Sequence, residues 1–345
     1  MQRSLRAVVA ACVAALALVA VACGDDNGGG GGGGQSTQET GKKVRVGLVT
    51  DVGGLNDRSF NQAANEGLKR ATSQLGIDAR VLISKGNADY VPNLSTLARQ
   101  NYDLIVANGY LMAEAVNTVA TKFPKAKFAI IDYSQAAMKN KPKNVQGLLF
   151  KEQEAGYLVG YLAGLYAKDS GGSVSTVGGQ KIPPVDHYIA GFRAGAKASN
   201  PNVKTLNGYS QSFDDQAKCK EIALDQIAKG SKLVFQVAGQ CGLGALDATK
   251  AKGVQAIGVD SDQSYLGPQI MTSALKKVDE AVYNAAKETQ DGTFKPGTDV
   301  LATVKNGGVG VGKFNSIGRK YAAQVKAVQA KIAAGQITNI PDEVQ

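Results

Sequence analysis

Several carboxylates of this 345-residue chain lie where short apolar runs end. Asp51, Asp132 and Asp260 each stand at the end of such a run, and Asp262 follows Asp260 closely. An ionised carboxylate accepts several hydrogen bonds, which suits the hydroxyl groups of a sugar. Paired acids can also perform acid–base chemistry or hold a metal ion. The first hypothesis is therefore a polar site that one edge of a sheet brings together.

Other polar or aromatic residues occupy the same kind of position. In open α/β sheets, ligands bind beyond the carboxyl ends of the strands, so these residues are also candidates for the site. They are Asn108, Tyr110, Ser210, Phe213, Gly239 and Gln240.

Helix capping is the alternative explanation for single acids at these positions. Asp51 or Asp57 could cap a helix that begins near Ser59, because a side-chain oxygen there accepts from free backbone amides. Asp214 and Asp215 could cap the next such helix. Capping alone explains the joint pattern at six strand ends less well than a ligand site does.

Strands and helices alternate along the chain from residue 43. Such alternation is typical of parallel sheets covered by helices on both faces. The predicted fold class is α/β, with two doubly wound parallel-sheet lobes and a ligand cleft between them. The expected strands are Val44–Thr50, Val81–Ser84, Leu104–Ala107, Phe128–Asp132, Val145–Phe150, Val174–Val177, Leu233–Val237 and Val254–Val259. The expected helices are Ser59–Leu75, Ala113–Phe123, Glu154–Ala167, Asp186–Ala198, Asp215–Ala228 and Gly244–Lys252.

Motifs of common enzyme classes are not convincing in this sequence. No GxGxxG follows a strand, and GxSxG does not occur. The glycine-rich string 307–312 precedes Lys313, but Phe314 stands where a phosphate-binding loop needs Ser or Thr. His187 is the one histidine of the sequence. We therefore expect no catalytic residue, no cofactor and no metal site.

The N-terminus reads as an export signal followed by an anchor. Residues 1–22 combine Arg3 and Arg6 with an Ala, Val and Leu run that is too short to span a membrane. Small residues precede Cys23, as in bacterial lipoproteins, and residues 23–42 form a glycine-rich tether. We expect a lipid-anchored protein on the extracytoplasmic face of the cell membrane, with Cys23 as the lipidated residue.

The remaining cysteines and the net charge add two expectations. An exported protein can keep disulfides, which favours a Cys219–Cys241 bond; two buried thiols are the alternative. The formal charge is +10, but the basic residues are scattered. A solvated basic surface is therefore favoured over a nucleic-acid partner.

Long segments resemble the basic membrane protein family of solute-binding lipoproteins, whose members have a type I periplasmic-binding-protein fold and serve ATP-driven importers. The segment VRVGLVTDVGGLNDRSFNQAA at 44–64 carries the likeness first. It continues in FAIIDYS (128–134), LLFKEQEAGYLVGYLAG (148–164), YSQSFDDQAKCKEIAL (209–224) and IGVDSDQ (257–263). The resemblance implies a nucleoside as ligand, a permease and an ATPase as partners, and no enzymatic activity.

The family pattern also implies residue roles. Phe60 and Phe213 would stack on a purine base, with Asp51 and Asn61 nearby and Asp132 on the base edge. Gly239, Asp260 and Lys276 would bind the ribose, with Asp262 second to Asp260. The sequence departs from the pattern at Cys219 and Cys241, where the family usually has small residues, and at Asn108 and Tyr110.

We expect the first lobe to comprise residues 43–147 plus about 266–304, and the second lobe 148–265 plus about 305–345. Binding would close the lobes of a monomer around the ligand. Two other functions remain open. One is a sensory or regulatory binding protein for a nucleoside or sugar-like ligand without an importer. The other is a nucleoside-processing enzyme that uses Asp260 or Asp262 as its base.

Overall fold

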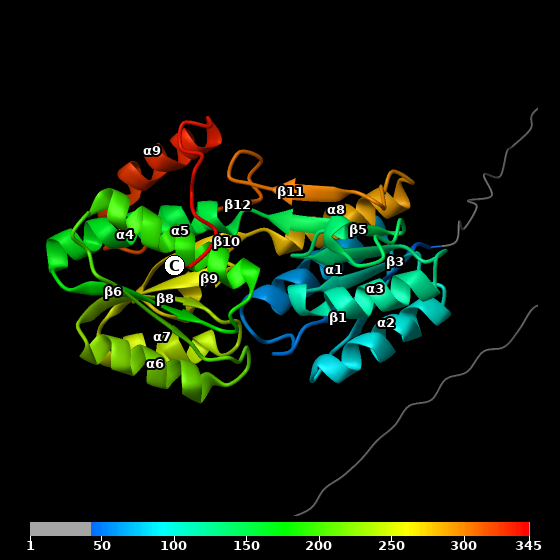
Figure 1. Cartoon of the computed structure of the whole chain (residues 1–345), viewed down its shortest axis with the longest axis horizontal. Helices are drawn as coiled ribbons and strands as arrows, with labels where there is room; N and C mark the ends of the chain where they lie inside the picture. Colours follow the sequence, from blue (N-terminus) through cyan, green and yellow to red (C-terminus); the bar gives the residue numbers. More distant parts are fainter. Residues whose placement is uncertain (1–42, 345) are drawn as a thin grey trace, which may run out of the picture. The chain divides into compact units, whose positions relative to one another are not determined.

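A computed structural model of the chain describes residues 43–344. These residues form two six-stranded sheets (Figure 1). The strands of the first sheet are β1 (Arg45–Thr50), β2 (Asp78–Leu82), β3 (Leu104–Asn108), β4 (Phe128–Ile131), β5 (Val145–Phe150) and β11 (Asp299–Ala302). Those of the second are β6 (Ser173–Gly178), β7 (Thr205–Tyr209), β8 (Ser231–Val237), β9 (Gln255–Asp260), β10 (Ile270–Lys276) and β12 (Val309–Val311).

Both sheets have the same strand arrangement. The first has the order β11-β5-β4-β3-β1-β2 and is parallel throughout. The second has the order β12-β10-β9-β8-β6-β7 and is parallel except for β12. Each strand of the first sheet therefore has a counterpart in the second. The predicted fold class, two doubly wound α/β lobes, is confirmed.

Helices cover both faces of each sheet. The helices are α1 (Phe60–Leu75), α2 (Tyr90–Arg99), α3 (Ala113–Lys122), α4 (Glu152–Ser170), α5 (Pro183–Ser199), α6 (Gln216–Ala228), α7 (Gly242–Lys252), α8 (Val278–Gln290) and α9 (Ala322–Ala333). Short 3₁₀ turns occupy Asn87–Asp89, Tyr110–Met112, Gln135–Ala137, Ser264–Leu266 and Gly318–Tyr321. Within the described residues, none of the helices is long and apolar enough to cross a membrane.

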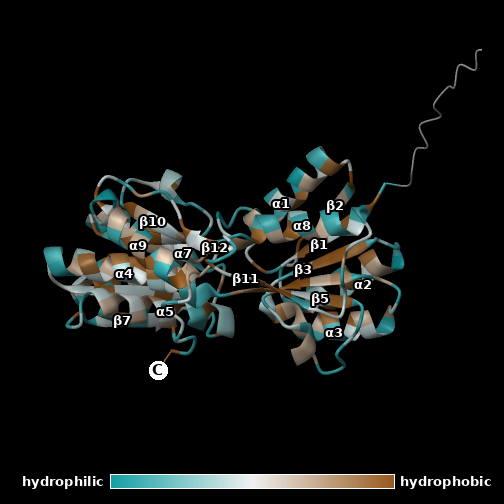
Figure 2. Cartoon of the chain, turned by 90° about the horizontal axis from the view of Figure 1, so that it is seen from above, coloured by the Kyte–Doolittle hydropathy of each residue, from teal (hydrophilic) through white to brown (hydrophobic). Residues whose placement is uncertain are grey.

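The strands bury apolar side chains on both faces because side chains alternate along a strand. In β3, Leu104 and Val106 face the core that α1 and α8 complete, while Ile105 and Ala107 face α2 and α3. In β8, Phe235 packs toward α4 and α5, on the opposite face from α6 and α7. Figure 2 shows these hydrophobic strands between helices with hydrophilic outer sides.

Helices α4 and α5 approach each other unusually closely. A Cβ on Gly160 would lie only 2.0 Å from the carbonyl oxygen of Phe192, and one on Gly195 would lie 2.0 Å from that of Tyr157. Only glycine allows this approach. The contact fixes the first turn of α4 beside α5, and both helix starts contribute side chains to the site described below.

The chain crosses between the lobes three times. It leaves the first lobe after β5, returns between β10 and α8, and crosses again between β11 and β12. The prediction that residues 266–276 belong to the first lobe is therefore wrong, because β10 pairs with β9 in the second sheet. The predicted boundary at residue 147 falls inside β5, all of which pairs within the first sheet.

Candidate functional site

A cavity lies where the strand ends of the two lobes meet. The volume that the centres of water-sized spheres can occupy in it is about 70 Å³. Both lobes contribute to its walls. It is lined by Asp51, Val52, Asp57, Phe60, Asn61, Gly109, Tyr110, Asp132, Ile182, Pro184, Val185, Tyr188, Phe213, Val237, Ala238, Gly239, Val259, Asp260 and Lys276.

Asp51 and Asn61 are tied to each other and to the backbone. The Asn61 side chain donates to the carbonyls of Asp51 and Val52 and accepts from the Asp51 amide and from Asn108 Nδ2. Asp51 Oδ1 accepts from the Val52 amide and from the Tyr90 hydroxyl. Burial raises the pKa of Asp51, although the Tyr90 hydrogen bond opposes this. Asn61 is thus committed to holding the loop in place.

Asp57 caps helix α1 at the cavity wall. Its carboxylate accepts from the amides of Ser59, Asn61 and Gln62 at 2.7–3.0 Å. These amides have no partner within the helix, so the carboxylate satisfies them. Burial nevertheless raises its pKa to about 6. Capping therefore explains Asp57, but not Asp51.

Lys276 stands at the centre of a buried charge cluster. Its Nζ lies 2.6 Å from Asp132 Oδ1 and 2.9 Å from Glu152 Oε1. The same ammonium lies 5.2 Å from the ring centroid of Phe60 and 4.9 Å from that of Phe150, so both rings stabilise it as well. Removing an ion from water costs several kcal/mol, and these partners offset that cost.

The pKa values of the three groups in this cluster are shifted in different directions. Burial raises the pKa of Asp132 to about 7, against the attraction of Lys276. Burial also acts to raise the pKa of Glu152, but Lys276 and His187 outweigh it and hold the pKa below its ordinary value. Burial disfavours the charged form of Lys276, yet Asp132 and Glu152 outweigh it and raise that pKa. Lys276 therefore stays charged.

Asp260 joins the two lobes. Its carboxylate accepts from the Ser59 hydroxyl at 2.6 Å and from the Tyr188 hydroxyl at 3.2 Å. Burial raises its pKa despite these bonds and the nearby Lys276. Ser59 belongs to the first lobe and Tyr188 to the second, so this acid links both sides of the cavity.

Asp132 and Asp260 share a rare backbone conformation. Their φ angles are 69° and 60°, a left-handed region that side chains other than glycine seldom adopt. Asp132 directly follows β4, and Asp260 is the last residue of β9. These two strands occupy equivalent positions in the two sheets. Such strain gathers at functional sites, so the shared geometry supports a common role in the cavity.

His187 lies between Glu152 of the buried charge cluster and the solvent. Its Nδ1 lies 3.1 Å from Glu152 Oε2, and its side chain is partly exposed. Burial lowers its pKa, but the hydrogen bond to Glu152 more than compensates and the pKa is raised. No sequence motif predicts this contact between His187 and Glu152.

Each lobe supplies one phenylalanine to the cavity. Phe60 begins α1, and Phe213 lies in the loop between β7 and α6. A Cβ on Gly179 would lie 2.4 Å from the Phe213 ring, so the ring rests against that glycine. Gly239 has a φ of 55°, and a Cβ there would lie 3.4 Å from the Phe213 carbonyl oxygen. The left-handed φ angle favours glycine in the turn beside this ring.

Among the residues to which the family pattern gives a role, Asp262 alone is absent from the cavity wall, and the strand-end candidates Asn108, Ser210 and Gln240 do not line it either. Asp262 Oδ1 accepts from the Ser264 amide, and Oδ2 accepts from the Lys313 amide. It is absent from the cavity wall because the chain has turned away two residues after β9. Asp262 is therefore a turn residue in this structure.

Two contributors to the site were missed. Glu152 follows β5 almost at once, so the rule of polar residues after strands could have found it. Tyr188 lies within a helix, and only the packing of α5 brings its hydroxyl to Asp260. No sequence pattern marks that contact.

The described residues show how Cys219 and Cys241 are paired and whether side chains gather as metal ligands do. Cys219 and Cys241 form a disulfide, as predicted. Residues 43–344 contain no group of three or more His, Cys, Asp or Glu side chains that could hold a metal ion. The expected signal segment and lipidated Cys23 lie outside the described residues.

Comparisons with known proteins identify the family of this chain. Residues 43–343 match the family of PnrA-like ABC transporter substrate-binding proteins (Bmp). A CD4+ T-cell-stimulating antigen of Listeria innocua is 35% identical, over 88% of this chain and 90% of the relative. The ABC transporter nucleoside-binding protein BmpA of Lactococcus lactis is 33% identical, over 86% of this chain and 88% of the relative.

A solved structure extends the similarity to the fold. An ABC transporter solute-binding protein from Aeropyrum pernix K1 superposes with a TM-score of 0.78 at 29% identity, covering 86% of this chain and 94% of that one. The resemblance seen in the sequence is confirmed. The chain belongs to the PnrA-like family of ABC transporter substrate-binding proteins.

Proposed function

We propose that this protein captures a purine nucleoside on the extracytoplasmic face of the membrane and delivers it to an ABC importer. One observation carries the proposal. The cavity combines an aromatic ring from each lobe with a buried cluster of carboxylates around Lys276. A nucleoside has a flat base and a hydroxyl-rich sugar, and this wall offers partners for both. A relative at 33% identity is named a nucleoside-binding protein.

The proposed roles follow from the chemistry of the wall. The base stacks on Phe60 and Phe213, and aromatic stacking contributes about 1–3 kcal/mol per base. Asp132 binds the base edge, while Asp260 and Lys276 bind the ribose hydroxyls beside Gly239. Asp51 lies near the ligand, and Asn61 holds the Asp51 loop through its own hydrogen bonds.

Lobe closure is the proposed mechanism, and it involves no covalent step. A ligand that contacts both lobes favours the closed state by its differential affinity. The three crossings between the lobes are the proposed hinge. Glu152 and Lys276 flank two of these crossings, and Glu154 Oε2 accepts from the Val304 amide of the third. Ligand contacts at Lys276 therefore bear directly on the hinge.

The membrane attachment forms part of the same proposal. We place a lipid anchor on Cys23, followed by the 24–42 tether, and we propose that the monomer meets its permease and ATPase in the closed state. Relatives of this chain from Pyrococcus species are named lipoproteins, which supports the anchor.

Titration calorimetry with adenosine, inosine, guanosine, uridine and ribose tests the proposal. We expect a purine nucleoside to bind in the micromolar range or tighter and to be recovered unchanged. Absence of binding by all nucleosides would overturn the proposed ligand. Recovery of free base would show an enzyme instead. Binding without a neighbouring gene pair for a permease and an ATPase would favour a sensory protein.

A further inference from the structure

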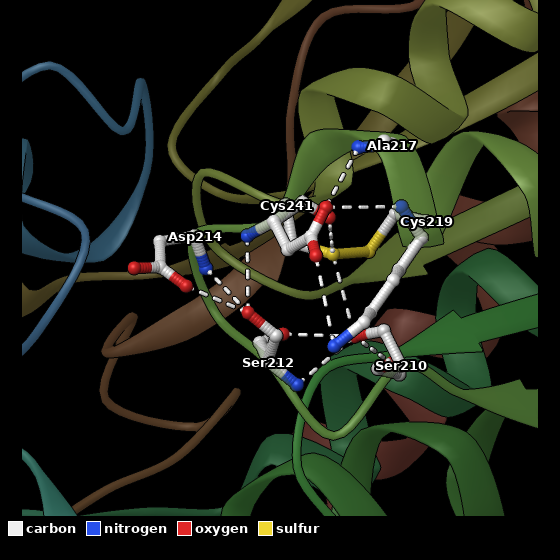
Figure 3. Close-up of polar contacts among 9 residues, drawn as sticks. Ser210, Ser212, Asp214, Ala217, Cys219 and Cys241 are labelled. Atoms are coloured by element: carbon white, nitrogen blue, oxygen red, sulfur yellow. Dashed lines mark hydrogen bonds and ion pairs between the residues drawn. A yellow bond between two sulfur atoms is a disulfide. The ribbon is translucent and has the colours of Figure 1, made fainter.

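A disulfide lies directly behind one aromatic wall of the cavity. Cys219 belongs to the first turn of α6, and Cys241 immediately precedes α7. Both residues are fully buried. Figure 3 shows the bond beside the loop that leaves β7 and carries Phe213. The bond therefore joins the starts of two helices at the cavity end of the second lobe.

Cys241 contacts the Phe213 loop at three points. Its amide donates to the Phe213 carbonyl oxygen at 2.9 Å. Its Sγ lies 3.3 Å from Ser210 Oγ and 2.8 Å from the carbonyl oxygen of Asp215. The residue that anchors one end of the disulfide is thus also the residue against which the loop is built.

Hydrogen bonds within the loop give it its shape, and a separate set of contacts attaches it to the lobe. Its internal bonds run through two hydroxyls: Ser210 Oγ donates to the Ser212 carbonyl, and Ser212 Oγ accepts from the amides of Asp214 and Asp215 (Figure 3). These bonds give the loop a shape but do not fix it to the lobe. Cys241 attaches the loop to the rest of the lobe, as do the strand-like bonds of Ser210 and Gln211 to β6 and the residue after it. The Phe213 ring also rests against Gly179, and the Asp215 carboxylate caps α6.

Small side chains dominate the core beneath the loop. Apart from the cysteines, this buried cluster consists of Val177, Ala223, Val234, Ala238, Ala245 and Ala248. The partly buried side chains of Ile222, Leu224, Ile227 and Val254 pack against this cluster. The disulfide adds a covalent link between the starts of α6 and α7 to this packing.

We propose that the Cys219–Cys241 disulfide is a positioning element for Phe213, so that the stacking of ligand on this ring depends on the bond. The inference rests on the proposed nucleoside function and assigns a role within that site to two residues outside the cavity wall. Phe60 has no such link, because it lies at the start of α1 in the other lobe. It is the matched control.

A double-mutant cycle tests the coupling. Phe213→Ala and Phe60→Ala are each made in the wild-type chain and in a Cys219→Ala/Cys241→Ala chain, and all are titrated with adenosine, inosine and guanosine. In the wild-type chain, each phenylalanine substitution should weaken binding at least tenfold. Without the disulfide, Phe213→Ala should weaken it less than threefold, whereas the Phe60→Ala factor should stay the same. Such non-additivity reports direct coupling.

The outcomes separate positioning from general stabilisation. A bond that only stabilises the fold would leave the Phe213→Ala factor equal in both chains, and that result would overturn the inference. If the double cysteine variant does not fold, wild-type protein prepared under a phosphine reductant replaces it, with two free thiols verified by mass spectrometry. The same factors are expected.

A ligand-free measurement keeps the test independent of the proposed function. Amide hydrogen exchange of residues 208–215 should become at least tenfold faster without the disulfide, while exchange of residues 60–75 stays unchanged. Unchanged exchange at 208–215 would overturn the inference even if nucleosides bind. Faster exchange with no nucleoside binding would support positioning of the loop and reject the proposed ligand.

Discussion

Lys276 is the residue on which the polar side of the cavity depends. Asp132, Glu152 and Asp260 approach it from both lobes, and all four side chains are buried. A buried ion pair adds little net stability compared with an apolar pair, but the loss of one partner leaves an uncompensated charge. The cluster therefore fits a binding role better than a purely structural one.

Replacing Lys276 should be strongly destabilising. We expect Lys276→Met to lower the free energy of unfolding by about 3–5 kcal/mol at pH 7, because the remaining acids lose their counter-charge. Lys320→Met is the matched control, since Lys320 pairs with Asp169 but is 67% exposed, and its loss should cost at most about 1 kcal/mol. Urea denaturation measures both. Similar small losses in the two variants would contradict the account.

Part of the cavity wall could be predicted from the sequence because those residues follow strand ends. Asp51, Asp132 and Asp260 were found in that way, while the resemblance supplied the roles of Phe60 and Lys276. The contact of Tyr188 with Asp260 could not be predicted, and neither could the hydrogen bonds of Asn61 to the backbone. Both depend on the way in which separate segments pack together. A strand-end rule likewise cannot separate Asp260 from Asp262.

At the scale of single elements, helix α1 depends on Asp57. Its carboxylate accepts from three amides of the Ser59–Gln62 turn, and its side chain is buried at the cavity. The start of this helix also carries Phe60. A disturbed first turn would therefore move a wall of the cavity.

We expect Asp57→Ala to lower the free energy of unfolding by about 2 kcal/mol, at the upper end of cap effects, since buried amides lose their acceptor. Asp215→Ala is the control: Asp215 caps α6 through two amides but is 40% exposed, so about 0.5–1 kcal/mol is expected. Thermal and urea unfolding compare them. An equal cost in both variants would show that burial of the cap does not matter.

Secondary-structure elements could be predicted where the hydrophobic pattern is strong. They could not be predicted where the chain crosses back from one lobe to the other. The elements up to β9 agree with the expected strands and helices, with small shifts of the bounds, except that β7 and α2 were not expected. Strands β10, β11 and β12 and helices α8 and α9 were not expected either. The lobe to which each belongs depends on tertiary pairing, which local periodicity does not contain.

At the scale of the whole molecule, buried acids should make stability depend on pH. Burial raises the pKa of Asp57 to about 6 and that of Asp132 to about 7, and it also raises those of Asp51 and Asp260. Such acids bind more protons in the folded than in the unfolded state between about pH 4 and pH 7. The free energy of unfolding must then fall as the pH rises through this window. The raised pKa of His187 acts in the same direction, because its contribution is present below its unfolded pKa and is lost as the pH rises through the folded value.

Thermal unfolding between pH 5 and pH 8 tests this expectation. The melting temperature should be higher at pH 5 than at pH 8, with each group adding at most about 1.4 kcal/mol per pH unit to the slope. Asp132→Asn cannot titrate and should flatten the profile near pH 7. Asp169→Asn, at an exposed site where Lys320 lowers the pKa, should leave it unchanged above pH 5. A melting temperature that increased from pH 5 to pH 8 would show that the raised pKa values of the buried acids do not govern stability.

The order of the strands has a consequence for synthesis. The first sheet is completed by β11, and α8 covers one of its faces, with Arg70 of α1 bonded to Glu280 of α8 across 210 positions in the sequence. Both elements emerge after all but one strand of the second sheet. The half of the molecule that is made first therefore cannot finish folding first. Until β11 (Asp299–Ala302) has been made, the β5 edge of this sheet is unpaired and open to pairing with another chain.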